Sequence, residues 1–206
     1  MSFFQNTRKP VGFGGRLMVK GMNSGSHAKL AEWGLSHITI AENARILDAG
    51  CGGGANVMRL LAKSPKGHVT GLDYSEVSVA ESEKVNQKAI ADGRCEIIQG
   101  DVSALPFPAE TFDLVTAFET VYFWPDPAKT FQGISRVLKT GGTFFICNES
   151  NGHDREAVKF SKIIDGMELY DAGQLCNLLQ QAGFKDIETD AKGIWLCVRA
   201  HCFRGA

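Results

Sequence analysis

The chain has no excess of charge of either sign. Its 22 Lys and Arg residues against 23 Asp and Glu residues give a formal net charge of −1. This balance provides no general attraction to nucleic acid or to an anionic membrane. No apolar run reaches the roughly 18 residues that a membrane-spanning helix needs. We therefore expect no membrane span and no nucleic-acid partner.

Closely spaced cysteine pairs are also missing. The six cysteines include no Cys-x-x-Cys pair, and several fall in expected strands, where a free cysteine behaves as a small hydrophobe. The first 15 residues lack the apolar core of a signal peptide. We expect reduced thiols, a cytoplasmic protein and no metal site. The cysteines are Cys51, Cys95, Cys147, Cys176, Cys197 and Cys202.

The most informative feature is the glycine-rich segment from Ile46 to Gly54, ILDAGCGGG. Two apolar residues lead into Asp48, and four glycines follow within six positions. This pattern is typical of a buried parallel strand that turns tightly into a helix. Glycine accepts positive φ and lets a ligand approach without meeting a Cβ atom. The segment predicts a floor for a nucleotide-like molecule at the carboxyl end of a sheet, although such turns serve several cofactors.

Further blocks follow this turn in order. A second expected strand, 68–72, ends at Asp73, about 20 residues after the turn, where an acid can bind both ribose hydroxyls. A third strand ends at Gly100-Asp101, and a fourth begins at Phe112. The segment 136–149 closes a helix, turns on two glycines and enters a fifth strand.

Helices alternate with these strands. Apolar residues at helical spacing mark helices around 57–61, 131–138 and 175–182. The last two strands, 184–189 and 193–200, have no helix between them and should form a hairpin. The alternation predicts an α/β fold with a mostly parallel sheet, helices on both faces and one antiparallel strand in the hairpin.

The N-terminal segment differs from the rest. Residues 1–21 are Gly-rich and basic, which fits a solvated arm, a flap over the active site or a dock for an anionic group. Residues 26–40 predict an extra helix beside the sheet. We divide the chain into an arm and helix at 1–43 and a main domain at 44–206. The cations that precede the first acid are Arg8, Lys9, Arg16, Lys20 and Lys29.

Taken together, the blocks between Ala44 and Ile146 resemble the class I S-adenosylmethionine-dependent methyltransferases. The resemblance is greatest to the small-molecule group that includes the ubiquinone/menaquinone-biosynthesis type, methyltransferase type 11. It implies a Rossmann-like, doubly wound, seven-stranded sheet. It also implies S-adenosylmethionine as cofactor, S-adenosylhomocysteine as product, and in-line transfer of the sulfonium methyl to a small molecule.

On this resemblance the glycine turn holds the amino-acid end of the cofactor. Gly50, Gly52 and Gly54 should pass closest to it, with Cys51 approaching through its backbone. Asp48 should reach the cofactor ammonium, directly or through water; the alternative is that it caps loop amides.

The resemblance places five further residues along the cofactor. Asp73 binds the ribose, and Tyr74 lies against the adenine. Asp101 and Val102 hold the adenine edge, unless Asp101 only caps the following turn. Glu119 stands at the rim where the methyl group is presented, or else is a solvated loop acid. As an acid at a loop rim, Asp73 should contribute little to stability without ligand.

The acceptor side is less defined. The aromatic run 122–124 could wall a pocket for a flat or apolar substrate, or pack beneath its loop. The segment 150–170, together with the arm, is the expected lid. The acceptor is not named by the sequence, so the catalytic residue is left open. The candidates are Glu119, Tyr122, His153 and His27, with Glu149 as a further proton acceptor.

Three alternatives stand beside this interpretation. A nicotinamide-dependent oxidoreductase would show G-x-G-x-x-G, whereas here the glycines run G-C-G-G-G into Ala55. A protein that keeps the cofactor site could lack catalysis. Methylation of tRNA or protein is the third alternative, because of the basic arm. Against nucleic acid, the rim 119–122 reads Glu-Thr-Val-Tyr and lacks the Asn-Pro-Pro-Tyr type of motif. The oligomeric state is not predicted.

Overall fold

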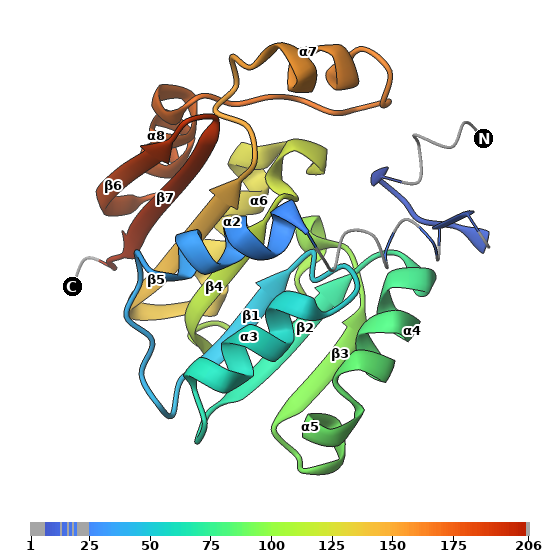
Figure 1. Cartoon of the computed structure of the whole chain (residues 1–206). Coiled ribbons are helices and arrows are strands. Elements are labelled where there is room, and N and C mark those ends of the chain that lie inside the picture. Colours follow the sequence, from blue (N-terminus) through green and yellow to red (C-terminus); the bar gives the residue numbers. More distant parts are fainter. Residues whose placement is uncertain (1–6, 13, 16, 18, 20–24, 205–206) are drawn as a thin grey trace.

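The computed structural model describes residues 7–12, 14, 15, 17, 19 and 25–204. Part of the basic arm, including Arg16 and Lys20, lies outside the described residues. The rest forms one sheet between two layers of helices (Figure 1). Among the described residues, no helix combines the length and apolar character that crossing a membrane requires.

The sheet has seven strands in the order β3-β2-β1-β4-β5-β7-β6. All pairs are parallel except those of β7, which runs antiparallel to both β5 and β6. The predicted fold is therefore confirmed, including the single antiparallel strand. The strands are β1 Arg45–Ala49, β2 His68–Asp73, β3 Cys95–Gln99, β4 Phe112–Phe118, β5 Leu138–Asn148, β6 Phe184–Lys192 and β7 Trp195–Cys202.

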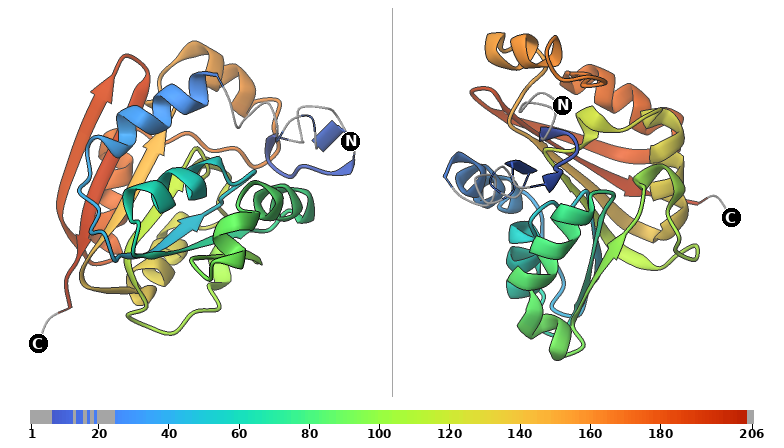
Figure 2. Two further views of the ribbon diagram at one scale, coloured as in Figure 1. Left: turned by 60° about the horizontal axis from the view of Figure 1, so that its bottom comes forward. Right: turned by 90° about the vertical axis from the view of Figure 1, so that its right-hand side faces the viewer.

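The helices lie on both faces of the sheet. Figure 2 shows α2 and α3 on one side and α6 and α8 on the other. The α-helices are α2 Ser26–Leu35, α3 Ala55–Lys63, α4 Glu76–Val85, α5 Gln87–Ala91, α6 Pro127–Val137, α7 Arg155–Ser161 and α8 Ala172–Gln181, and the short 3-10 helices are η2 Val102–Ala104 and η3 Val121–Phe123.

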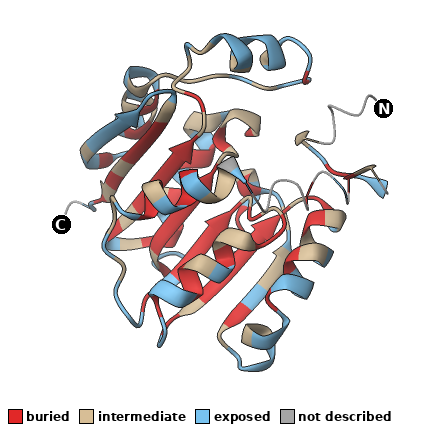
Figure 3. Cartoon of the chain, viewed as in Figure 1, coloured by how far each residue is buried: buried red, intermediate tan, exposed pale blue. Residues whose placement is uncertain are grey.

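Each face of the sheet carries its own core because neighbouring strand residues point to opposite sides. On β1, Ile46 packs with the α2–α3 side and Leu47 with the α6–α8 side. On β5, Phe145 and Phe144 divide in the same way. The central strands are consequently buried over most of their length (Figure 3). This two-sided burial explains the near-continuous apolar runs in the sequence.

Several boundaries differ from the predictions. The N-terminal helix ends at Leu35 rather than near residue 40, where the β-branched residues of 38–40 follow. Strand β5 begins at Leu138, which was predicted as helical, and includes Gly141-Gly142 as an irregularity in its pairing with β4 rather than as a preceding turn. Strand β6 extends to Lys192 because it stays paired with β7.

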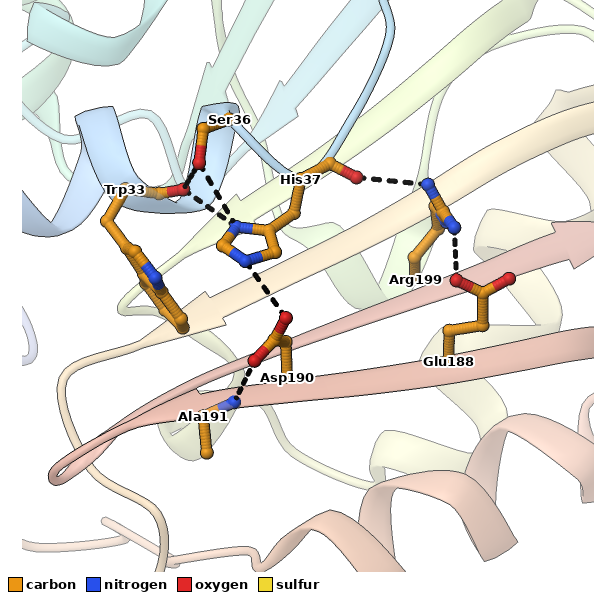
Figure 4. A network of polar contacts seen from close by, with 7 residues as sticks. All are labelled: Trp33, Ser36, His37, Glu188, Asp190, Ala191 and Arg199. Carbon is orange, nitrogen blue, oxygen red and sulfur yellow. Dashed lines mark hydrogen bonds and ion pairs between the residues drawn. The ribbon is translucent and has the colours of Figure 1, made fainter.

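A network of polar contacts ties the end of α2 to the C-terminal hairpin (Figure 4). The His37 ring contacts the Trp33 carbonyl through Nδ1 at 2.8 Å and the Asp190 carboxylate through Nε2 at 3.1 Å. Arg199 donates to the His37 carbonyl at 3.0 Å and pairs with Glu188. These contacts anchor α2, the element that carries His27 at its other end, to the sheet.

We predict that Phe144→Ala destabilises the fold by about 3–5 kcal/mol, because this fully buried ring is the centre of an aromatic cluster. Its centroid lies 5.2 Å from Phe131, 5.7 Å from Phe184 and 6.3 Å from Trp124. Urea unfolding measures the change. The matched control is Phe203→Ala, because that side chain is 43% exposed; its change should stay within about 0.5 kcal/mol. Equal effects would contradict the assignment of this core.

Candidate active site

The glycine turn is fastened to the end of β2. The amides of Gly50 and Cys51 both donate to the Leu72 carbonyl, at 2.8 and 3.0 Å. Gly50 has a φ of 80°, and a Cβ on it would stand 2.2 Å from the Thr120 hydroxyl. Only glycine therefore allows the loop after β4 to lie directly on the turn after β1.

Gly52 lies at the tip of the turn and faces open space. A Cβ built there would meet no described atom within 4 Å, and the residue lines the large cavity described below. Gly54 is different: a Cβ there would stand 2.4 Å from the hydroxyl of Ser82 on α4. The turn therefore has one side open to a ligand and one side packed against a helix.

Asp73 is an acceptor for two backbone amides. One carboxylate oxygen accepts from Gly52 at 3.0 Å and the other from Ser75 at 2.9 Å. The residue is only 8% exposed, and burial raises its pKa. It lines the cavity while also holding the turn in place. Asp73 is therefore no simple rim acid, and the basis for expecting little contribution to stability is wrong.

Asp48 lies beneath the turn, 1% exposed. Its Oδ1 accepts from the Thr116 hydroxyl at 2.7 Å, while its Oδ2 is buried without a hydrogen-bond partner among the described residues. Burial raises the pKa of Asp48 to about 7, against the hydrogen bond from Thr116. Neither Asp48 nor Gly54 is among the described residues that line the cavity. Asp48 thus leaves one unsatisfied polar atom directly under the glycine turn.

The end of β3 supplies the next wall. Asp101 caps η2 through bonds from the amide and hydroxyl of Ser103, at 2.8 and 2.7 Å, and it also lines the cavity beside Val102. Asp101 therefore caps the following turn, as the alternative interpretation expected, and at the same time forms part of the cavity wall. Tyr74 lines the same region, and its hydroxyl donates to the Arg8 carbonyl.

The described part of the N-terminal arm forms part of the cavity wall. Ser75 donates its hydroxyl to the Pro10 carbonyl at 2.8 Å, which docks the arm on the β2–α4 connection. The Arg8 guanidinium donates to the Asp165 carbonyl at 2.8 Å, and a Glu168 amide donates to the Tyr122 carbonyl at 2.8 Å. The two expected lid segments therefore contact each other at Arg8. The arm residues at the cavity are Thr7, Arg8, Pro10 and Val19.

Glu119 forms the opposite rim. It has a φ of 56°, and its amide donates to the Cys147 carbonyl at 2.9 Å. Both carboxylate oxygens lie 2.8 Å from Nδ1 of His27, although the two residues are 92 positions apart. Glu149 lies 4.0 Å from the same nitrogen. The hydrogen bond to Glu119 raises the pKa of His27, although burial acts in the opposite direction.

The aromatic run divides between core and cavity. Phe123 and Trp124 line the cavity. Trp124 is also buried, with 7% of its surface exposed, and its ring stacks on Phe144. Its Nε1 donates a hydrogen bond to the Thr120 hydroxyl at 3.0 Å. Tyr122 packs edge-on against Phe123, and burial raises its pKa well above the usual range. The run thus contributes both to the cavity wall and to the packing beneath the loop, and Trp124 does both.

Two catalytic candidates lie apart from the cavity. Of the described residues that line it, none is Tyr122 or His153. The His153 side chain is 74% exposed and lies 3.6 Å from Asp171. His27 and Glu119 both line the cavity, so the structure brings together these two of the four candidates.

Sequence reasoning missed a polar pair on α3. Asn56 and Arg59 line the cavity, and Arg59 donates to the Asn56 side chain at 3.0 Å. The helical spacing could have revealed this pair. Residues three apart are neighbours on a helix surface, and both differ from the buried residues of this helix, Val57, Leu60 and Leu61.

These walls enclose one cavity at the carboxyl ends of the parallel strands, with about 1220 Å³ of empty space when its open mouth is counted. Eight of the ten predicted cofactor residues line it. The residues fit S-adenosylmethionine: a carboxylate follows each of two neighbouring strands, the turn is open at Gly52, and Asp48 has an unsatisfied oxygen below it. The list of eight is Gly50, Cys51, Gly52, Asp73, Tyr74, Asp101, Val102 and Glu119.

Comparison with known proteins gives several relatives that are named as methyltransferases. The chain is 30% identical over 190 residues to a demethylmenaquinone methyltransferase of Lactiplantibacillus plantarum, covering 79% of each protein. It is also 30% identical over 165 residues to the cycloartenol-C-24-methyltransferase of Arabidopsis thaliana, covering 73% of this chain and 49% of that enzyme. The chain spans only 29–49% of the length of the plant sterol methyltransferases that it matches.

Solved structures share the fold. A SAM-dependent methyltransferase from Aquifex aeolicus superposes with a TM-score of 0.76 at 20% identity, covering 91% of this chain and 98% of that one. The family model for the methyltransferase domain matches residues 40–192. The chain therefore belongs to the methyltransferase domain family, whose members carry the S-adenosylmethionine-binding fold that its motifs resemble.

Proposed function

We propose that this protein transfers a methyl group from S-adenosylmethionine to a small-molecule acceptor. The observation that carries the proposal is the convergence of four sequence blocks, distant in the chain, on one cavity at the switch point of the sheet. When bound, the cofactor supplies a methyl group on a sulfonium sulfur, which is already an activated donor. The protein then needs mainly to hold an acceptor in line with that methyl.

In this proposal each wall of the cavity binds a different part of the cofactor. The Asp73 carboxylate already accepts hydrogen bonds from the amides of Gly52 and Ser75. Its remaining oxygen lone pairs accept hydrogen bonds from the ribose hydroxyls. Asp101 and Val102 hold the adenine edge beside Tyr74. The open turn at Gly52 takes the amino-acid end. The described arm residues exclude water from the same space.

Two observations support a small acceptor with an apolar body. Phe123 and Trp124 line the cavity. The relatives include enzymes named for demethylmenaquinone and for cycloartenol, which are apolar small molecules. The net charge of −1 supports neither tRNA nor DNA as acceptor. In this proposal the described residues of the 1–43 region form a wall of the site in the domain at 44–206. We also propose a cytoplasmic location.

We predict that Asp73→Ala weakens S-adenosylhomocysteine binding at least tenfold, about 1.4 kcal/mol. Loss of an acceptor for the Gly52 and Ser75 amides should also lower stability, by about 1–3 kcal/mol for each amide left unpaired. Isothermal titration and thermal unfolding measure the two effects. Asp92→Ala, at an exposed helix end, is the control and should change neither. Unchanged affinity in Asp73→Ala would refute the ribose assignment.

A second prediction compares two glycines with positive φ, Gly52 at 51° and Gly93 at 70°. A Cβ on either meets no described atom within 4 Å, so both alanine variants share a backbone cost of about 1–2 kcal/mol. Only Gly52→Ala places a methyl group in the cavity. Its affinity for S-adenosylhomocysteine should fall at least about tenfold by isothermal titration, whereas Gly93→Ala should bind like the wild type. Equal affinities would place the cofactor elsewhere.

The acceptor class can be tested with radiolabelled S-adenosylmethionine and separate pools of tRNA, DNA, protein and small metabolites. We expect label in the small-metabolite pool, with Asp73→Ala showing much less. Removing the arm is a poor control, because Arg8 and Pro10 are part of the cavity wall. Label that enters tRNA, with binding that weakens steeply as salt rises, would overturn the small-molecule proposal.

A further inference from the structure

The pair formed by His27 and Glu119 has the geometry of a proton acceptor at the rim of the cavity. Both residues line the cavity, and the carboxylate contacts Nδ1 with both oxygens at 2.8 Å. An ionised carboxylate can only accept hydrogen bonds, so Nδ1 carries the proton in this contact. In the neutral imidazole, Nε2 is then the nitrogen with the free lone pair.

We propose that His27 is the general base of the reaction and that Glu119 positions it, which assigns the acceptor to compounds that lose a proton on methylation. This inference rests on the proposed methyl transfer. It defines the acceptor more narrowly than size and polarity do: a phenol, a hydroquinone, an alcohol, an amine N–H or an activated C–H fits. A thioether or a tertiary amine loses no proton and does not require the pair.

The acceptor atom forms a bond to the methyl carbon as the carbon–sulfur bond breaks, and that electron pair returns to sulfur, which becomes a neutral thioether. The acceptor's proton passes to Nε2 of His27. The imidazolium is then stabilised by Glu119 through Nδ1. The positive charge thus moves from the sulfonium to a histidine that already faces a carboxylate.

The surroundings of His27 favour this role. Carboxylate oxygens of Glu119 and Glu149 lie 2.8 Å and 4.0 Å from Nδ1 of His27. Tyr122 and Cys147 are further titratable groups near Glu119. Both carboxylates stabilise the imidazolium, so the pKa of His27 is raised, with the hydrogen bond to Glu119 as the largest cause. A raised pKa makes His27 a stronger base, but it is neutral and able to accept a proton only above that pKa.

The backbone holds Glu119 firmly. Its φ of 56° lies in the left-handed region, which is sparsely populated by residues with a side chain. Two contacts stabilise this strained conformation. The Glu119 amide donates a hydrogen bond to the Cys147 carbonyl, and the next residue, Thr120, packs on Gly50 and accepts a hydrogen bond from Trp124. Strain of this kind persists only where the surroundings fix it, and it directs the carboxylate toward His27.

The same three side chains could also hold a cation. One ligand atom each from His27, Glu119 and Glu149 lies within 4.8 Å of the others. A metal ion would occupy the imidazole and carboxylates that the proton transfer needs. Tight binding of Zn²⁺ or Mn²⁺, with a Kd below about 1 μM that is lost in His27→Asn, would therefore overturn the proposal.

The first test is an NMR titration of the five histidines in the protein with S-adenosylhomocysteine bound. His27 is assigned by its loss in His27→Asn. We expect its pKa to fall in Glu119→Gln, which keeps a hydrogen-bond acceptor and removes the charge. The internal control is His68, at the amino end of β2, whose pKa burial lowers and which should not respond. A His27 pKa that does not change in Glu119→Gln would overturn the pairing.

The second test measures labelled methyl transfer to two probes, 1,4-naphthohydroquinone and dimethyl sulfide. With the hydroquinone, His27→Asn should lose about 10²-fold or more in rate. The acid limb of the pH–rate profile should move to lower pH in Glu119→Gln. The matched control Glu83→Gln, at an exposed position of α4, should behave like the wild type. Equal rates for His27→Asn and the wild type, or label entering only dimethyl sulfide, would overturn the assignment.

Binding separates this inference from the proposed function. His27→Asn should keep its fold by circular dichroism and its affinity for S-adenosylhomocysteine by isothermal titration. If the wild type binds no S-adenosylhomocysteine, the methyl-transfer proposal fails. If it binds and His27 does not respond to Glu119→Gln, only the base assignment fails. Should neither probe take label, the NMR titration decides.

Discussion

Three consecutive amides hold the glycine turn against the end of the neighbouring strand, and the site is built on this contact. Gly50 and Cys51 donate to the Leu72 carbonyl, and Gly52 donates to the Asp73 carboxylate. The turn therefore has no freedom to follow a ligand; its shape is set before one arrives. A preformed site binds without the cost of ordering a loop, which improves affinity. The same contact makes Asp73 both a ligand-facing residue and a structural one.

The far rim depends on the same turn from the other side. Thr120 lies directly on Gly50, in the space that a side chain would fill, so the loop after β4 takes its place from the turn after β1. The preceding residue, Glu119, is held in its left-handed conformation and contacts His27. The anchoring of α2 through His37 to the hairpin completes the arrangement. This rim of the cavity is thus assembled from four separate parts of the chain.

Polar contacts also hold the N-terminal arm at the cavity, where Thr7, Arg8, Pro10 and Val19 line the wall. The arm reaches the β2–α4 connection through Pro10 and the 150–170 segment through Arg8. The contact at Pro10 is buried and the one at Arg8 is exposed. No described residue of the 150–170 segment lines the cavity, so this segment meets the arm rather than the cavity wall.

The sequence alone determined the architecture and the cofactor wall. Apolar runs bounded by glycine turns predict strands and helices from local physics, and residues directly after strand ends must gather at one edge of a parallel sheet. Gly50, Gly52, Asp73 and Asp101 accordingly line one cavity. Boundaries such as the end of α2 at Leu35 were missed because propensity is weak over a single turn.

Only the tertiary structure decided the contacts made across the sheet. No spacing rule connects His27 to Glu119, because they come from a helix outside the main alternation and from a loop 92 residues later. Nor does any rule reveal that Asp73 bonds two backbone amides, that Asp48 is buried, or that His153 lies outside the cavity wall among the described residues. Local sequence fixes which elements form and where each strand ends. Packing alone fixes which side chains from distant elements meet, because that depends on the relative placement of the elements in space.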